Sequence, residues 1–194
     1  MKSQHQEKKK DKYYEIKELN FYQIGKSQVT LWHRPGKKEI YDLKNLQNIS
    51  LIVTLQGTGE NPNEIKKGCQ QNGIQHKWIN IQGANQALLD DKKVIAYLVE
   101  RIQELYENLS TQQERVLIHC AAGVHRTGIT AYTLLRLDGL CPQDAYETLK
   151  LIRLNTYQGV GEWRIQLAEA KIVPPLMKII LENQSKEILQ QSNE

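Results

Sequence analysis

Residues 115–128 read RVLIHCAAGVHRTG and decide what fold the chain predicts. The first five residues form a short apolar run that is typical of a buried strand. A helical pattern then begins at Thr127 and continues to Leu137. Between the strand and the helix lies a short loop that holds a cysteine, a glycine and an arginine. We therefore predict a strand, a tight loop and a helix, with the loop at the carboxyl end of the strand.

The loop has the residue types that phosphate-ester chemistry needs. Cys120 stands just before the helix, where backbone N–H groups and the helix dipole lower the pKa of a thiol. The N–H groups of residues 121–126 are expected to surround a bound anion. Gly123 suits the positive φ that such a loop requires. Arg126 can bind two phosphate oxygens at once with its planar guanidinium.

Two further residues complete the predicted loop. Thr127 can donate a hydrogen bond to the Cys120 sulfur when that sulfur becomes a leaving group. Gly128 is expected to let the helix pack closely on the strand. The predicted phosphate-binding positions are Ala121, Ala122, Gly123, Val124, His125 and Arg126.

The motif HCAAGVHRTG at 119–128 matches the His-Cys-x5-Arg-Thr/Ser signature of the protein tyrosine phosphatase superfamily, and the chain resembles its small dual-specificity-like branch. The resemblance implies that Cys120 forms a phosphocysteine intermediate and that Arg126 binds the phosphate and the transition state. It also implies that His119 holds the loop and tunes the thiol, and that Thr127 assists breakdown of the intermediate. It implies no metal and no cofactor, and phosphorylated proteins as substrates.

The rest of the pattern predicts an α/β domain with a mostly parallel central sheet flanked by helices. Expected strands are two within 20–33 around the Gly25 turn, and single strands at 49–55, 75–81 and 115–119. Expected helices are 43–46, 63–72, 90–109, 127–137, 142–154, 161–171 and, after an interruption at Pro174-Pro175, a last one to about Gln190. Ligands in such sheets bind beyond the carboxyl ends of the strands, where the 119–128 loop lies.

We expect a basic N-terminal tail at 1–19, a phosphatase domain at 20–172 and a C-terminal helical extension at 173–194. The 194 residues suit one domain with a full core. The tail carries Lys2, Lys8, Lys9, Lys10 and Lys12. It is interpreted first as a solvated tail, and alternatively as a contact for an acidic partner such as phosphoinositide headgroups, nucleic acid or an acidic protein surface. No specific nucleic-acid motif is present.

The sequence indicates an intracellular protein in a reducing compartment, by default the cytoplasm. No apolar stretch approaches the roughly 20 residues that span a membrane. The N-terminus lacks the apolar core of a secretory signal. Three cysteines are too few and too scattered for a disulfide framework. A pairing of Cys120 with Cys69 or Cys141 in a redox switch stays an open alternative.

The expected general acid is missing from its usual place. Relatives carry an aspartate on the loop after an earlier strand, but residues 82–86 read QGANQ. Asp90 or Asp91 could reach the pocket from a lengthened loop, although we favour the interpretation that they cap the following helix. Glu162 is a more distant candidate. A substrate with a good leaving group would need no acid.

Gln158 lies on a late loop, where some tyrosine phosphatases position the hydrolytic water with a glutamine; surface polarity is the simpler interpretation.

The variable loop positions hold no lysine, which favours a singly phosphorylated protein side chain over a polyphosphorylated lipid. Two functions follow as hypotheses. The chain is a protein phosphatase acting on phosphotyrosine or phosphoserine/threonine, or it is a phosphate-binding module that kept the loop but lost efficient catalysis.

Overall fold

The computed structural model describes residues 16–191. Residues 1–15, which include the lysines of the basic tail, and residues 192–194 lie outside the described residues. The predicted contact of the tail with an acidic partner therefore stays a prediction.

A five-stranded sheet forms the centre of the chain, in the order β1-β2-β5-β3-β4. Its strands are β1 (Tyr22–Ile24), β2 (Ser27–Trp32), β3 (Leu51–Leu55), β4 (Gln75–Ile79) and β5 (Arg115–His119). The β2–β5, β5–β3 and β3–β4 pairs are parallel, and β1 is antiparallel to β2. The predicted α/β fold with a mostly parallel sheet is confirmed.

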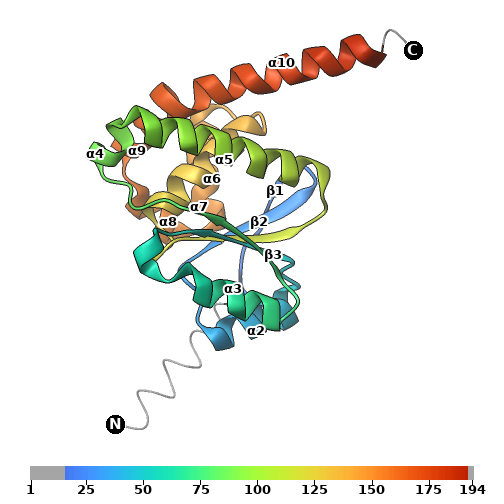
Figure 1. Cartoon of the computed structure of the whole chain (residues 1–194), viewed down its shortest axis with the longest axis vertical. Helices are drawn as coiled ribbons and strands as arrows, with labels where there is room; N and C mark the ends of the chain where they lie inside the picture. Colours follow the sequence, from blue (N-terminus) through green and yellow to red (C-terminus); the bar gives the residue numbers. More distant parts are fainter. Residues whose placement is uncertain (1–15, 192–194) are drawn as a thin grey trace.

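Helices cover both faces of this sheet (Figure 1). One layer contains α2 (Lys37–Gln47) and α3 (Pro62–Gln71). The other layer contains the helices α5 (Lys92–Thr111), α6 (His125–Leu137) and α7 (Pro142–Ile152), with α10 (Val173–Gln191) outermost. Shorter elements are η1 (Thr58–Glu60), α4 (Gln86–Asp90), α8 (Leu154–Val160), α9 (Glu162–Leu167) and the π-helical η2 (Ala168–Ile172). Across residues 16–191, no helix is long and apolar enough to cross a membrane.

The central strands are apolar on both faces because each face is covered. Val53 and Ile118 belong to the core beneath α5 and α6, whereas Ile52 and Leu117 belong to the core beneath α2 and α3. Alternate side chains of one strand point to opposite faces, so β3 and β5 supply both cores at once. These two strands were predicted from their continuous apolar runs for the same reason.

The prolines at 174 and 175 do not interrupt the helix, contrary to the sequence-based expectation. The chain passes from α9 through η2 directly into α10. Pro174 and Pro175 fall in the first turn of α10, directly after the π-helical η2, and proline is tolerated in the first turn of a helix. Val173 and Leu176 are buried in this region. The start of α10 is thereby part of the hydrophobic core.

Gly128 lets α6 pack closely on α8 rather than on a strand, which corrects the expectation. A Cβ built at Gly128 would lie 2.5 Å from Val160 Cγ2 and 2.8 Å from Val160 Cβ. Val160 is fully buried. The contact holds α8 against the beginning of α6.

Gly128→Ala is expected to lower the free energy of unfolding by about 1–3 kcal/mol, because the added methyl group overpacks this contact. Urea unfolding followed by circular dichroism measures the change. Gly59→Ala is the control, since nothing lies within 4 Å of a Cβ at Gly59. An equal loss in both variants would contradict the packing role of Gly128.

Candidate active site

The loop between β5 and α6 is a closed cradle around Cys120. Its carbonyl groups are turned outward to neighbouring segments. Ala121 O accepts from the Arg34 N–H at 2.9 Å, and Gly123 O accepts from Thr156 Oγ1 at 2.7 Å. Arg153 Nη1 also donates to Gly123 O at 2.8 Å. With its carbonyls held outside, the loop turns backbone N–H groups toward the sulfur of Cys120.

Gly123 is required at its position for two reasons. Its φ is +69°, in the left-handed region that favours glycine. A Cβ there would lie 2.0 Å from the carbonyl oxygen of Trp32 at the end of β2. No side chain fits between the loop and this strand end.

The environment of Cys120 favours the thiolate. The residue is only 3% exposed, and this burial by itself raises the pKa of the thiol. Hydrogen bonds from the Thr127 hydroxyl and N–H, the charge of Arg126 and the N–H of Val124 outweigh the burial, so the pKa of Cys120 is lowered. The buried Thr127 hydroxyl has no nitrogen or oxygen partner among the described residues. It is therefore available to the Cys120 sulfur, and its role in breakdown of the intermediate stays a prediction.

Arg126 is fixed by a carboxylate that the sequence reading missed. Arg126 Nη2 donates to Glu60 Oε1 at 2.9 Å, and Nη1 donates to Glu60 Oε2. Arg126 Nη1 also donates to the backbone carbonyl oxygen of Ile81 at 3.0 Å. These contacts leave the Nε–H and one Nη2–H for Cys120, with which Arg126 also bonds, and for a bound phosphate. Burial lowers the pKa of Arg126, but its bonds with Glu60 and Cys120 raise it overall, and the charge is kept.

Glu60 is ionised and fixed at the end of η1. The hydrogen bond from Arg126, opposed by burial and aided by the Gly57 N–H, lowers its pKa to about 2. The Gly57 N–H donates to Glu60 Oε2 at 2.8 Å. A signal for Glu60 was present in the sequence, because the carboxyl ends of parallel strands meet at one edge and Glu60 follows β3 closely. At neutral pH this carboxylate has no proton to give to a leaving group.

His119, the last residue of β5, anchors the first peptide of the loop. Its Nδ1 donates to Cys120 O at 2.9 Å, and its Nε2 accepts from Thr54 Oγ1 at 2.8 Å. Burial lowers the pKa of His119 to about 3, so the ring is neutral. A neutral ring with its proton on Nδ1 is the tautomer that these two contacts require.

His125 adds less positive charge to the loop than an ordinary histidine would. Burial, followed by the charges of Arg164 and Arg126, lowers the pKa of His125. Arg164 itself donates to Ala84 O at 2.7 Å and to Val160 O at 2.9 Å. The loop thus brings together the predicted phosphate-binding residues, with Arg126 as their fixed charge.

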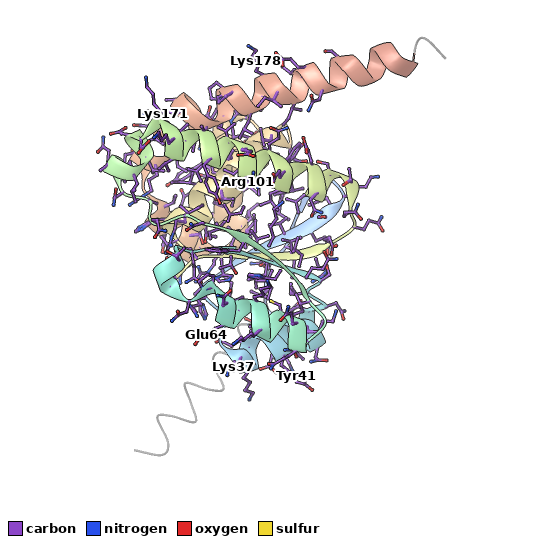
Figure 2. All side chains as sticks on the ribbon, in the orientation of Figure 1. Lys37, Tyr41, Glu64, Arg101, Lys171 and Lys178 are labelled. Carbon is purple, nitrogen blue, oxygen red and sulfur yellow. The ribbon has the colours of Figure 1, made fainter. Side chains whose placement is uncertain are left out.

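Asp90 and Asp91 have partners outside residues 119–128. Asp91 is the N-cap of α5, and its Oδ1 accepts from the Lys93 N–H at 2.7 Å. Asp90 pairs with Lys171 at 2.5 Å, and Figure 2 shows Lys171 on the side of α5 and α10. The favoured interpretation, that the pair caps the helix, is confirmed for Asp91.

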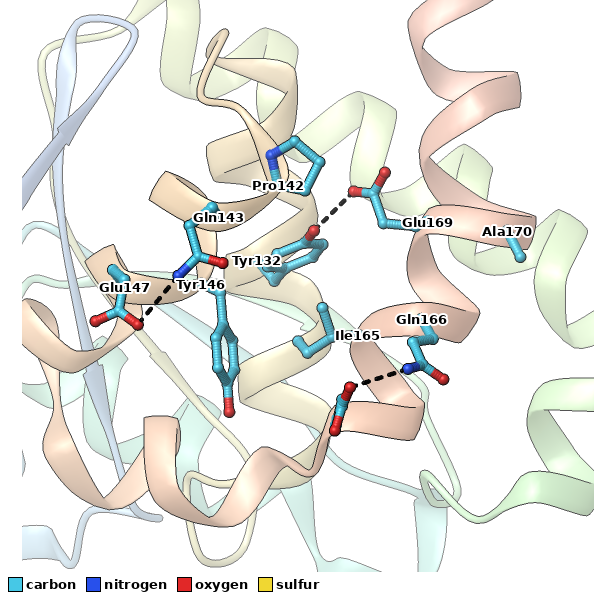
Figure 3. Close-up of a pocket in the computed structure, with 10 residues that line it drawn as sticks. Tyr132, Pro142, Gln143, Tyr146, Glu147, Ile165, Gln166, Glu169 and Ala170 are labelled. Atoms are coloured by element: carbon cyan, nitrogen blue, oxygen red, sulfur yellow. Dashed lines mark hydrogen bonds between the residues drawn. The ribbon is translucent and has the colours of Figure 1, made fainter.

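Glu162 is one of the residues that line a different hollow, and Figure 3 shows that hollow. This hollow, about 640 Å³ in volume, is lined by residues of α6, α7, α9 and η2, and by none of residues 119–128. Glu162 Oε1 accepts from Gln166 Nε2 at 3.1 Å. Glu162 therefore does not stand as the proton donor to a phosphate held by the 119–128 loop.

Gln158 lies on α8, beside the loop. The side chain is exposed, and the next residue, Gly159, packs so closely that a Cβ there would lie 2.6 Å from Val124 Cγ1. A role for Gln158 in positioning water stays a prediction.

Within residues 16–191, no three His, Cys, Asp or Glu side chains cluster in a way that could hold a metal ion.

The other two thiols are poorly placed for a disulfide with Cys120. Cys141 is the N-cap of α7, beyond the far end of the 13-residue α6, which is about 20 Å long. A disulfide requires Cα atoms within about 7 Å. Cys69 lies on α3 and is fully buried in the core on the other face of the sheet from the core that contains Cys120, and burial raises its pKa to about 12. The redox alternative has no geometric support.

Comparisons with known proteins agree with this geometry. The sequence profile described as the tyrosine phosphatase family matches residues 25–150, which is more than half of the chain. No curated protein sequence matches the chain.

Solved structures share the fold. The core catalytic domain of the PP-IP phosphatase Siw14 from S. cerevisiae is 17% identical with a TM-score of 0.58, over 84% of this chain and 92% of that one. PTPMT1 is 18% identical with a TM-score of 0.59, over 86% and 99%. The kinase associated phosphatase KAP is 21% identical with a TM-score of 0.52, over 77% and 96%. At these identities the likeness shows the fold alone.

Glu60→Gln is expected to lower kcat/KM for an aryl phosphate by about tenfold or more, because Arg126 loses the carboxylate that orients it. Steady-state kinetics at neutral pH measures the change. Glu64→Gln is the matched control, since Glu64 pairs at 2.9 Å with Arg34 and its side chain is 66% exposed. Equal activities of the Glu60 variant and the wild type would contradict the orienting role.

The same pair gives a pH signature in stability. The pKa of Glu60 is about 2 in the folded chain against an ordinary 4.5, so its stabilising effect is complete above pH 4.5 and is lost as the pH falls toward 2. The stability difference between wild type and Glu60→Gln should shrink over that interval. Urea unfolding at a series of pH values measures this, and a difference that does not vary with pH would contradict it.

Asp90→Asn and Asp91→Asn are each expected to keep kcat within about threefold of wild type. A general acid contributes about 10²–10⁴ to rate, so its loss would be obvious. Asparagine also caps helices, which preserves the start of α5 in the Asp91 variant. A hundredfold fall in kcat in either variant, with phosphate binding retained, would assign the acid to that residue.

Proposed function

The chain belongs to the tyrosine phosphatase family, and from that premise we propose that it hydrolyses phosphomonoesters on proteins through a phosphocysteine intermediate. The observation that carries the proposal is the cradle at the end of β5. A buried thiol with a lowered pKa lies in it beside an arginine whose orientation is fixed by Glu60. The loop brings together a nucleophile, anion-binding N–H groups and the guanidinium of Arg126, as phosphoryl transfer requires.

The first step forms a bond between Cys120 Sγ and phosphorus while the bond from phosphorus to the ester oxygen breaks. The phosphoryl oxygens are bound by the loop N–H groups and by the Nε–H and Nη2–H of Arg126. In the second step water attacks phosphorus, its proton passes to solvent, and the sulfur leaves as a thiolate. The Thr127 hydroxyl donates to that sulfur as its charge returns.

The substrate proposed within this class is phosphotyrosine. Glu60 is ionised, Asp91 caps α5, Asp90 pairs with Lys171, and Glu162 faces another hollow. The leaving oxygen must therefore depart with little help from a protein carboxyl group. A phenol, with a pKa of about 10, leaves more easily as an anion than the alcohol of serine or threonine.

A singly phosphorylated group fits the loop better than a polyphosphorylated one. Positions 121, 122, 124 and 125 carry no lysine, and the lowered pKa of His125 keeps that ring largely neutral. Nearby arginines are engaged with backbone carbonyls, Arg153 with Gly123 O and Arg164 with Ala84 O. One structural neighbour is described as a PP-IP phosphatase, so an inositol pyrophosphate belongs in the substrate panel.

The second candidate function is a phosphate-binding module with weak catalysis. It is favoured by the same placement of carboxylates, because a cradle without a proton donor still binds phosphate. In either function Cys120 must stay reduced, and Cys69, Cys120 and Cys141 are free thiols. We extend the proposal to a reducing, cytoplasmic setting and to a phosphorylated protein as partner.

Cys120→Ser is expected to lower turnover of para-nitrophenyl phosphate by about 10³-fold or more, because serine is a far weaker nucleophile in this cradle. Orthovanadate should inhibit the wild type. Cys141→Ser is the control, since Cys141 caps α7 away from the loop. Initial rates follow the product phenolate.

A panel of phosphotyrosine peptide, phosphoserine peptide and inositol pyrophosphate then tests the substrate. Phosphotyrosine should have the highest kcat/KM. A preference for phosphoserine or for the pyrophosphate would overturn the substrate proposal while leaving the mechanism intact. Turnover that survives in Cys120→Ser would overturn the mechanism. No wild-type turnover, combined with phosphate binding by calorimetry, would establish the binding module.

A further inference from the structure

A line of polar side chains crosses three strands beneath the active-site loop. Thr54 on β3 faces His119 on β5, because the two are register partners in the parallel pair. Thr54 Oγ1 lies 2.8 Å from His119 Nε2 and 2.9 Å from His76 Nε2 on β4. His119 Nδ1 continues the line to Cys120 O at 2.9 Å. The line therefore runs from the edge strand β4 to the catalytic loop.

The donors along this line have one consistent direction. A carbonyl oxygen only accepts, so His119 Nδ1 carries the proton bonded to Cys120 O. The neutral ring then accepts at Nε2 from the Thr54 hydroxyl. Because the Thr54 hydroxyl already donates its proton to His119, it accepts a hydrogen bond from the Nε2–H of His76. Each proton position is determined by the next partner in the line.

The setting preserves this direction at neutral pH. Thr54 and His119 are fully buried, and His76 is partly exposed. Burial lowers the pKa of His76 to about 4, with a smaller effect of Lys66 on α3. The groups whose charge acts on His119 are His76, Arg34 and His33, and each disfavours a second proton on its ring. A second proton on His119 would lie on Nε2 and would reverse the direction of both hydrogen bonds made by Thr54 Oγ1.

The end of the line bears directly on the sulfur. Cys120 O belongs to the first peptide of the loop, and the Nδ1–H of His119 holds this carbonyl at 2.9 Å. A carbonyl oxygen turned toward the sulfur would oppose its negative charge, whereas the N–H groups of Val124 and Thr127 support it. The carbonyl orientation is therefore part of what keeps the thiolate.

We propose that His76 is a positioning residue for catalysis, which acts through Thr54 to hold His119 in the tautomer that donates to Cys120 O. The role in catalysis rests on the proposed phosphocysteine mechanism. The test of the hydrogen-bond line does not, because it measures the Cys120 thiolate without turnover. His76 touches neither the phosphate nor the sulfur. It supplies the donor that completes the direction of the line from the partly exposed edge of the sheet.

The test measures the Cys120 thiolate without turnover. In a Cys141→Ser background, the rate of alkylation by iodoacetamide is followed against pH, and loss of the rate in Cys120→Ser identifies the thiol. His76→Phe removes the donor and keeps a ring, and His76→Gln restores an N–H donor. Thr54→Val removes the central hydroxyl, and Thr54→Ser restores it. Lys77→Met is the strand control, since Lys77 pairs with Glu104 on α5.

The expected result is an upward shift of the alkylation midpoint of about half a pH unit or more in His76→Phe and Thr54→Val. The valine variant should show the larger shift, because it removes the donor to His119 itself. His76→Gln and Thr54→Ser should recover at least half of the shift, and Lys77→Met should show none. Nitrogen NMR of the His119 ring should report loss of the pure Nδ1–H tautomer in the shifted variants.

Unshifted midpoints in folded His76→Phe and Thr54→Val would overturn the proposal, as would shifts that the glutamine and serine variants fail to reduce. Circular dichroism melting identifies a folded variant. If Thr54→Val does not fold, His76→Phe and His76→Gln decide the matter alone. An inactive wild type with these shifts intact would defeat the proposed function and leave the positioning role standing.

Discussion

A negative charge must be stable on a sulfur that is almost closed to water, and the rest of the structure depends on this constraint. Cys120 is 3% exposed at the end of an apolar strand. Its charge is balanced by N–H groups and by Arg126, which is itself largely buried and is balanced by Glu60. The Gly57 N–H in turn binds Glu60. Each buried charge thus needs the next, and the loops after β3 and β5 are held together by this sequence of contacts.

The sheet and the long helices could be predicted because their signals are local. Continuous apolar runs identify β3 and β5, and helical spacing with an aspartate cap identifies α5. The failures come from partners distant in sequence. Two prolines end a helix in most contexts, but here they follow the π turn at 168–172 and lie in the first turn of α10. Gly128 was assigned to a strand contact because nothing local indicates that α8 packs against it.

The residues of the candidate site also fall into those that local sequence patterns predict and those that depend on distant partners. The loop residues 119–128 were identified from their own spacing, and the structure brings Cys120 and Arg126 together. Glu60 was missed because its role appears only when the ends of β3 and β5 are placed side by side. The line from His76 through Thr54 was equally invisible, since it follows strand register and not sequence spacing.

The pairing of Arg126 with Glu60 also determines how far away the site can be sensed. A guanidinium and a carboxylate at contact distance nearly cancel each other's field a few ångströms outside, so this pair adds little to the charge that a distant phosphate meets. Arg153 and Arg164, which donate to backbone carbonyls beside the loop, keep their charges. The dependence of substrate encounter on ionic strength should therefore come from these outer arginines, whereas Arg126 selects the partner at contact.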